Sequence, residues 1–231
     1  MKRDLLERLN AARRDRHSAL VITDLGGGAS RLIVEGDAYA SDPRSREIAE
    51  RLTSGVSGAD ASGKTFFTVH VPPTRIVLIG AVHVAQALVP MAELAGFDIL
   101  VVDPRTGFAS PERFPAVKLL TEWPQNALPR LGLDRFTALA TLTHVPDIDD
   151  PALVAALRAE CCYIGALGSR KSHAKRLERL RKAGFGETDL AVIRAPIGLA
   201  IGARSPGEIA VSILAEIIEA VHRQAPVRGG Q

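Results

Sequence analysis

Cysteine is nearly missing from this 231-residue sequence, which contains only Cys161 and Cys162. Adjacent residues rarely reach the geometry of a disulfide, so the sequence excludes a disulfide framework, and we expect both thiols to lie in a buried strand. Aromatic residues are also scarce, at 4% of the chain. Because no stacking platform or recognition motif accompanies its basic residues, we expect no nucleic acid partner.

Uncharged stretches long enough to span a membrane are missing as well. The longest one, residues 76–92, contains Gly80, His83, Gln86 and Pro90, and it predicts a strand, a turn and a helix instead. The first twenty residues are charged and amphipathic and lack the apolar core of a secretory signal, so we expect a cytoplasmic protein. The hydrophobic content of 46% and the charged content of 24% are typical of a chain that folds.

The first third of the chain predicts a small α+β unit that ends at two consecutive prolines, which gives a first domain of residues 1–73. Its predicted elements are a helix at residues 2–15, strands at 19–22 and 31–34, a helix capped by Asp42, a loop at 54–64 and a strand at 65–71.

From residue 74 to residue 231, apolar strands alternate with helices, which is typical of a parallel sheet covered on both faces. The expected strands are 76–80, 97–103, 116–120, 136–143 and 161–167, and the expected helices are 83–95, 123–131, 151–159, 169–183 and 206–221. A capping box at Ser205 and Glu208 predicts the start of the last helix. The predicted fold is therefore α/β, a Rossmann-like parallel sheet with helices on both faces, preceded by the α+β unit.

The first candidate site is the turn after the strand at residues 76–80. A dinucleotide-binding fingerprint needs small residues where this chain has Gly80, Val82 and Ala85, and an acidic residue about 20 residues later, which Asp103 supplies. The β-branched Val82 stands where a pyrophosphate needs bare backbone, so a repurposed cleft is an equal alternative. In both cases the helix N-terminus at His83 offers amides to an anion.

The second candidate site follows the strand at residues 136–143. Ligands bind at the carboxyl ends of parallel strands, where this chain places His144, Asp147, Asp149 and Asp150. These side chains could serve catalysis or bind a hard cation. Helix capping explains the carboxylates better, because Asp150 precedes a proline as N-caps often do. We therefore predict no metal site and assign no catalytic residue.

The third candidate site joins the strand at residues 161–167 to a strongly basic helix. Gly165, Gly168 and Ser169, followed by Arg170 and Lys171, predict a cradle for a phosphate or a similar anion at a helix N-terminus. The competing interpretation is an ordinary turn before a solvated basic helix. We favour a small anionic ligand.

Five ordered motifs, which cover about residues 74–222, resemble the XdhC/CoxI family of xanthine dehydrogenase accessory proteins. These motifs are GAVHVAQAL, VVDPR with FASPERFP, LTHVPDIDDPAL, YIGALGSRKSHAKRLERL and PIGLAIGARSPGEIAVSILAEI. The resemblance implies a Rossmann-type domain that binds molybdenum cofactor, as molybdopterin or its dinucleotide, protects it during sulfuration and delivers it to a molybdenum hydroxylase apo-subunit. It also implies a cysteine desulfurase as partner and a homodimer.

We expect one cofactor-binding crevice to draw on all three sites. Its expected members are Gly80, Val82, His83, Asp103, Arg105, His144, Gly165, Gly168, Ser169 and Arg170. Val82, Val145 and Ala200 depart from the family pattern, which has a glycine at the first position and acidic residues at the other two. Two alternatives stay open: an NAD(P)-dependent oxidoreductase, and a non-catalytic scaffold whose ligand site has decayed.

Overall fold

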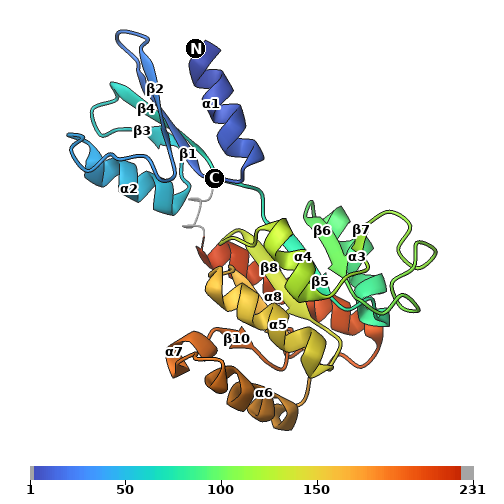
Figure 1. Ribbon diagram of the computed structural model, residues 1–231. Helices are drawn as coiled ribbons and strands as arrows, with labels where there is room; N and C mark the ends of the chain where they lie inside the picture. The colour runs from blue at the N-terminus through green and yellow to red at the C-terminus, as the bar shows by residue number, and fades with distance from the viewer. Residues whose placement is uncertain (1–2, 225–231) are drawn as a thin grey trace. The chain divides into compact units, whose positions relative to one another are not determined.

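The computed structural model describes residues 3–224, and the chain divides into two compact units (Figure 1). The second unit consists of residues 73–221, and the first contains the residues before Pro73 together with residues 222–224. The elements of the first unit are α1 (Arg3–Arg14), β1 (Ala19–Asp24), β2 (Ser30–Val34), α2 (Ser45–Ser54), β3 (Gly58–Ala59) and β4 (Thr65–His70).

The first unit is an antiparallel sheet with a helix on each face. The strand order is β2-β1-β4-β3. Leu5 and Leu9 of α1 pack against Val21 on one face, and Ile48 of α2 packs with Phe67 on the other. Alternate strand residues point to opposite faces, so the period-two pattern of β1 fills both small cores.

Two details of this unit differ from the sequence prediction. Helix α2 begins at Ser45 rather than after Asp42, because Asp42 forms an ion pair with Arg31 and accepts a hydrogen bond from the Arg44 amide, 2.9 Å away. The predicted loop at residues 54–64 also contains the two-residue strand β3, which pairs with β4. A strand this short has no periodicity to detect.

The second unit alternates strands and helices along most of its length. Its elements are β5 (Arg75–Ile79), α3 (His83–Leu94), β6 (Asp98–Val102), β7 (Lys118–Leu120), α4 (Pro124–Leu131), β8 (Thr137–Thr141), α5 (Pro146–Arg158), β9 (Tyr163–Ala166), α6 (Arg170–Lys182), α7 (Glu187–Leu190), β10 (Ile193–Arg194) and α8 (Pro206–Gln224).

The six strands of this unit form one parallel sheet of order β10-β9-β8-β5-β6-β7. This order confirms the predicted α/β fold with a Rossmann-like sheet. Strands β5 and β8 are neighbours, and the chain extends from them toward opposite edges of the sheet. The switch point of the topology therefore lies between β5 and β8.

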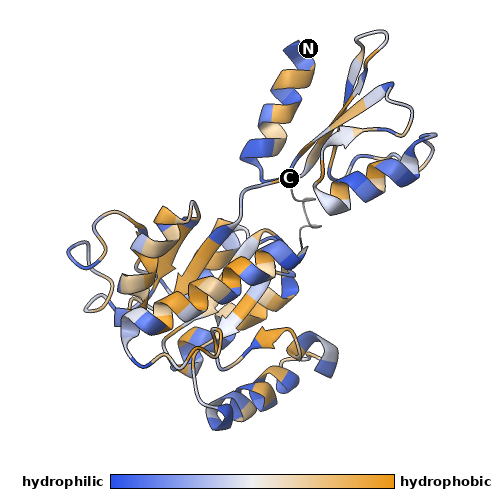
Figure 2. Cartoon of the chain, turned by 180° about the vertical axis from the view of Figure 1, so that it is seen from behind, coloured by the Kyte–Doolittle hydropathy of each residue, from blue (hydrophilic) through white to orange (hydrophobic). Residues whose placement is uncertain are grey.

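Helices cover both faces of the sheet, and the strands divide their side chains between two cores. Ile76 and Leu78 of β5 face α3 and α8, whereas Val77 and Ile79 face α4 and α5. Figure 2 shows the strands as mainly hydrophobic and α6 as mainly hydrophilic. Among the described helices, none combines the length and the apolar character that a membrane crossing requires.

Helix α5 begins earlier than predicted, and Asp150 is not its cap. The helix starts at Pro146, which takes the first helical position after Val145. Asp150 lies inside the helix and forms an ion pair with Arg179 of α6, which ties the two helices together. A second proline at position 151 suggested a helix start in the sequence, but it is the sixth residue of α5 and lies inside the helix, where it donates no backbone hydrogen bond.

The predicted capping box of α8 is confirmed. Glu208 accepts hydrogen bonds from the amides of Arg204 and Ser205, at 2.7 and 2.9 Å, and the Glu208 amide donates to Oγ of Ser205 at 3.3 Å. Elements α7 and β10 have no sequence counterpart in the prediction, because each contains four residues or fewer.

Candidate functional site

The loops that follow β5 and β8 meet at the switch point. Ligands of open parallel sheets bind in the crevice outside the carboxyl ends of such strands. Gly80 follows β5 with a φ of 118°, and a Cβ atom at this position would lie 2.7 Å from Cγ2 of Thr143. Glycine is needed here both for its backbone conformation and for the close approach of the two loops.

Asp103 fastens the turn after β5 to the loop after β6. Its fully buried carboxylate accepts hydrogen bonds from the Ala81 amide at 2.8 Å, from the Arg105 amide at 3.0 Å, and from Nε and Nη2 of Arg105 at 2.9 and 2.8 Å. Burial raises the pKa of Asp103, but the hydrogen bonds from Arg105 and Ala81 outweigh it and leave the pKa below its ordinary value. Both oxygens are thus already engaged by the chain itself.

Val82 and His83 form the start of α3. Val82 is the N-cap in an extended conformation, and its side chain, which makes no capping hydrogen bond, packs against the core. His83 is the first helical residue and is exposed. The first turn of α3 contains no acidic side chain, so its amides and the helix dipole can attract an anion.

An aromatic ring stands in the loop after β6. The guanidinium of Arg105 lies 4.4 Å from the ring centre of Phe108, and that of Arg113 lies 5.8 Å from it. Arg113 also donates to Oε1 of Gln86 in α3 at 2.8 Å. These contacts hold the loop against α3 and leave Phe108 42% exposed.

The loop after β8 is shaped by a buried carboxylate. Asp149 of α5 accepts hydrogen bonds from Oγ1 of Thr143 at 2.6 Å and from the His144 amide at 3.0 Å. Burial raises the pKa of Asp149, although the Thr143 hydrogen bond and the charge of Arg176 oppose that rise. Held in this way, His144 takes a φ of 61° and presents an exposed imidazole.

Gly165 has a packing role in the structure. It lies inside β9, and a Cβ atom there would come within 2.5 Å of Cδ1 of Ile197 and 2.6 Å of the Tyr163 hydroxyl. Only glycine lets the loop that follows β10 pack closely on β9. Gly165 therefore shapes the wall behind the third candidate site.

Gly168, Ser169 and Arg170 form the start of α6 as the sequence predicts. Ser169 is the N-cap and accepts a hydrogen bond from the Ser172 amide at 3.2 Å, and Arg170 is exposed. Gly168 has a φ of 144°, and a Cβ atom at this position would lie 3.6 Å from Nδ1 of His144. The second and third candidate sites are thus brought together in space.

Arg176 also lies in this region, although the sequence did not predict it as a site residue. It lies on the inner side of α6, one turn before the core residue Leu180, and only 3% of it is exposed. Its Nη2 donates to the carbonyl of Leu167 at 2.9 Å. The available signal was an arginine at a position where the helical period of α6 calls for an apolar side chain.

The glycine-rich loop between β10 and α8 is anchored by Glu216. One carboxylate oxygen of Glu216 accepts hydrogen bonds from the Tyr163 hydroxyl at 2.6 Å and from the Gly198 amide at 2.7 Å. Gly198 has a φ of 90° and lies against Ser212, while Ala200 is exposed. The loop is therefore fixed to β9 and α8.

The two cysteines are not strand residues, since β9 begins at Tyr163, and both are free thiols. Burial raises the pKa of Cys161 to about 12, so it is a poor nucleophile and a poor metal ligand at neutral pH. Within residues 3–224, no group of three or more His, Cys, Asp or Glu side chains could hold a metal ion.

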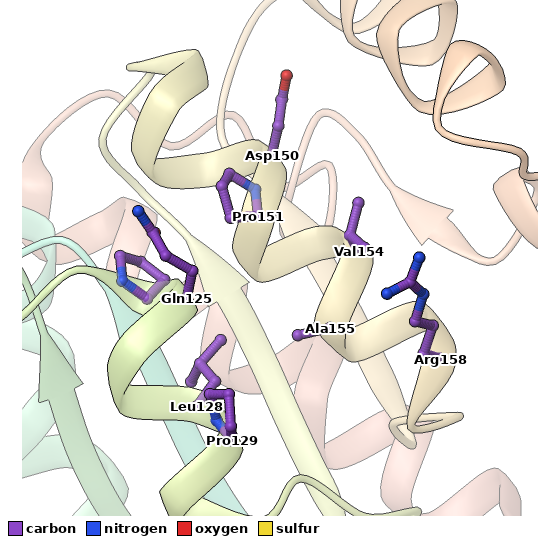
Figure 3. Close-up of a pocket in the computed structure, with 9 residues that line it drawn as sticks. Gln125, Leu128, Pro129, Asp150, Pro151, Val154, Ala155 and Arg158 are labelled. Atoms are coloured by element: carbon purple, nitrogen blue, oxygen red, sulfur yellow. The ribbon is translucent and has the colours of Figure 1, made fainter.

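A separate groove of about 430 Å³ runs between α4 and α5 (Figure 3). Its lining consists mostly of apolar side chains, with polar groups at Gln125, Asp150 and Arg158. Asp150 already pairs with Arg179. None of the ten expected cofactor-binding residues lines this groove, so we place the candidate site at the carboxyl edge of the sheet.

The strand order and the meeting of loops at the switch point define a Rossmann-type domain. The chain belongs to the XdhC family, because the model of the XdhC Rossmann domain matches residues 76–217. This match confirms the resemblance that the five sequence motifs indicate.

Three curated relatives cover most of the chain. It is 34% identical to the uncharacterized protein YqeB of Escherichia coli strain K12 over 89% of the chain and 39% of that protein. It is 30% identical to the molybdenum cofactor insertion chaperone PaoD of the same strain, over 76% and 48%. It is 35% identical to a probable xanthine dehydrogenase subunit of Bacillus subtilis strain 168, over 68% and 46%. The chain thus spans less than half the length of these relatives.

One solved structure resembles the whole chain. It is a crystal structure of a xanthine dehydrogenase from Bacillus halodurans, with a TM-score of 0.65 and 22% identity, over 98% of this chain and 66% of the other. At this identity the likeness shows a shared fold.

Proposed function

We propose that this protein carries molybdenum cofactor, as molybdopterin or its dinucleotide, and takes part in the maturation of a molybdenum hydroxylase. The observation that carries the proposal is membership of the XdhC family together with the similarity to PaoD, a molybdenum cofactor insertion chaperone. The similarity to a probable xanthine dehydrogenase subunit from Bacillus subtilis supports the view that the partner is a molybdenum hydroxylase apo-subunit.

The geometry at the carboxyl edge of the sheet supports an anionic cargo. The α3 and α6 helices both begin there, and neither has an acidic residue in its first turn. Arg170 and Lys171 are exposed at the start of α6. Molybdopterin carries a phosphate and its dinucleotide form a pyrophosphate, which helix N-termini and basic side chains bind well.

The proposal also covers the second partner, the location and the oligomeric state of the protein. Protection of the cofactor during sulfuration calls for a cysteine desulfurase as second partner, and cofactor insertion calls for a cytoplasmic protein. A homodimer would present two cofactor sites to the hydroxylase. Pull-down with the desulfurase and light scattering of the purified chain measure these two associations.

An NAD(P)-dependent oxidoreductase fits the geometry less well. In the standard pose, the acidic residue after the second strand accepts a ribose hydroxyl, but both oxygens of Asp103 already accept hydrogen bonds from Ala81 and Arg105. Val82 also places a side chain where the pyrophosphate approaches. Calorimetric titration with NAD and NADP should therefore show no binding.

The test of the carrier function is recovery of the cofactor with the protein. We expect molybdenum and pterin to co-purify with the chain from a host that makes molybdenum cofactor, as measured by mass spectrometry and absorbance. His144→Asn should reduce the recovered pterin, because it removes the imidazole while asparagine tolerates the positive φ. Lys182→Gln, at the exposed far end of α6, is the control. A wild-type protein free of pterin would contradict the proposal.

A further inference from the structure

Arg176 is a buried cation whose hydrogen bonds are incomplete. Only 3% of the residue is exposed, yet its Nε has no hydrogen-bond partner. The guanidinium donates to the Leu167 carbonyl at 2.9 Å and lies 3.5 Å from Nδ1 of His173. Burial lowers the pKa of Arg176 below its ordinary value, although the charges of Asp149 and Asp150 oppose that effect.

The nearest carboxylates are committed to other partners. Asp149 and Asp150 attract Arg176 from a distance, but Asp149 binds Thr143 and the His144 amide, and Asp150 pairs with Arg179. Native proteins satisfy buried polar groups and pair buried charges, and an exception points to a bound ion or to a functional role. An anion next to Arg176 would supply the missing compensation.

The space beside Gly168 brings the required donors together. The atom nearest to a Cβ built on Gly168 would be Oγ of Ser172, at 2.6 Å, and beyond it lie Nδ1 of His144 at 3.6 Å and Nη2 of Arg176 at 3.7 Å. These two side chains therefore flank the same point, directly before the N-cap Ser169 of the 13-residue helix α6. The positive end of the helix dipole and the exposed Arg170 add to the field at this point.

The start of α3 is less well equipped for the same ligand. Its Ala81 amide is already taken by the carboxylate of Asp103, and Val82 occupies the position next to it. The usual pyrophosphate turn of the fold is thus partly blocked, whereas the start of α6 has a buried cation beneath it.

We propose that His144, Gly168, Arg176 and the first turn of α6 form a binding site for the dianion of a phosphate monoester. This inference rests on the proposed carrier function and assigns the phosphate of the cargo to α6 rather than to α3. Arg176 acts as the buried charge that selects a dianion, and Gly168 carries no side chain that would clash with the Ser172 hydroxyl and separate Arg176 from His144.

The experiment titrates the purified protein with inorganic phosphate, in chloride buffer of constant ionic strength, and follows it by calorimetry and by amide NMR. We expect shifts at Gly168, Ser169 and Arg170 rather than at residues 81–83. Arg176→Met should weaken phosphate binding roughly tenfold or more, the scale of a hydrogen-bonded charge. Lys175→Met, which removes the same charge from the exposed neighbouring position, should leave the affinity unchanged.

The same titration on protein loaded with molybdenum cofactor separates the cargo phosphate from free phosphate. If the cargo phosphate fills the site, the loaded protein no longer takes up inorganic phosphate. Three outcomes would overturn the inference, even if the protein carries cofactor. They are phosphate-induced NMR shifts confined to residues 81–83, equal phosphate affinity in the two variants, and no phosphate binding by the wild type. Conversely, if phosphate binding depends on Arg176 but no cofactor is found with the protein, the anion site stands and the carrier function fails. The NMR shifts of the wild type decide the location even if Arg176→Met does not fold.

Discussion

Asp103 and Asp149 each hold a loop at the carboxyl edge of the sheet, yet their pKa values move in opposite directions. Burial raises both pKa values. For Asp103, the hydrogen bonds from Arg105 and Ala81 overcome that effect, whereas for Asp149 they do not. The difference follows from the bidentate guanidinium, since Asp149 receives one hydroxyl and one amide hydrogen bond in its place.

Replacing each aspartate by asparagine should give opposite pH dependences of stability. The lowered folded pKa of Asp103 stabilises the wild type at pH values above 3.8, and this advantage over Asp103→Asn is lost as the pH falls through the folded pKa. The raised folded pKa of Asp149 gives an advantage over Asp149→Asn that is complete below pH 3.8 and is lost as the pH rises through the folded pKa.

Denaturant unfolding of the wild type and both variants over a series of pH values measures this difference. Parallel pH profiles for the two variants would show that the two carboxylates do not differ as described.

The close packing at Gly165 predicts that a larger residue there destabilises the fold. Gly165→Ala should lower the free energy of unfolding by about 1–3 kcal/mol, because the new Cβ overlaps Ile197 and Tyr163. Gly207→Ala is the matched control, since a Cβ at this position of α8 meets no atom within 4 Å and should stabilise the helix by about 0.5–1 kcal/mol. Urea unfolding gives both values, and equal effects would refute the packing argument.

The first residues of the helices show where prediction from the sequence succeeded and where it failed. The starts of α6 and α8 could be predicted because Ser169 and the Ser205–Glu208 box are local capping signals. The start of α5 could not, because two prolines, Pro146 and Pro151, both suit a helix start and the choice depends on the tertiary contact between Asp150 and Arg179. Elements β3, β10 and α7 are too short to show a period.

The capping box of α8 can be tested directly. Ser205→Ala should lower the free energy of unfolding by about 1 kcal/mol, since the Glu208 amide loses its acceptor. Ser205→Asp retains an acceptor and should restore most of that loss. The comparison uses chemical denaturation, and an alanine variant as stable as the wild type would show that the box contributes nothing.

At the scale of the whole molecule, the parallel fold followed from the alternation of apolar strands and helices. The ten expected site residues do not all have the same role in the structure. Distance in sequence hid how near His144 lies to Gly168, and the Asp103–Arg105 pair holds loops in place. Arg176 was missed, because its place at an apolar position of the helical period was the only sign in the sequence and tertiary packing decides whether such a side chain is buried.

The division into two compact units predicts that the chain from Pro73 onward folds without the residues before it, because residues 73–221 form one unit by themselves. Its two cores are built from the parallel sheet and the helices that follow it. A fragment starting at Pro73 should unfold cooperatively, and its amide NMR spectrum should overlay the corresponding signals of the full chain. A collapsed fragment without dispersed signals would contradict independent folding.

The carrier function is the central claim, and transfer of cofactor tests it most directly. Chain purified with its cofactor is mixed with a molybdenum hydroxylase apo-subunit, the carrier is removed by affinity capture, and the hydroxylase is assayed for molybdenum. The account predicts that molybdenum leaves the carrier and appears in the hydroxylase, and that chain purified without cofactor transfers none. A hydroxylase that stays free of molybdenum while the carrier keeps its load would contradict it.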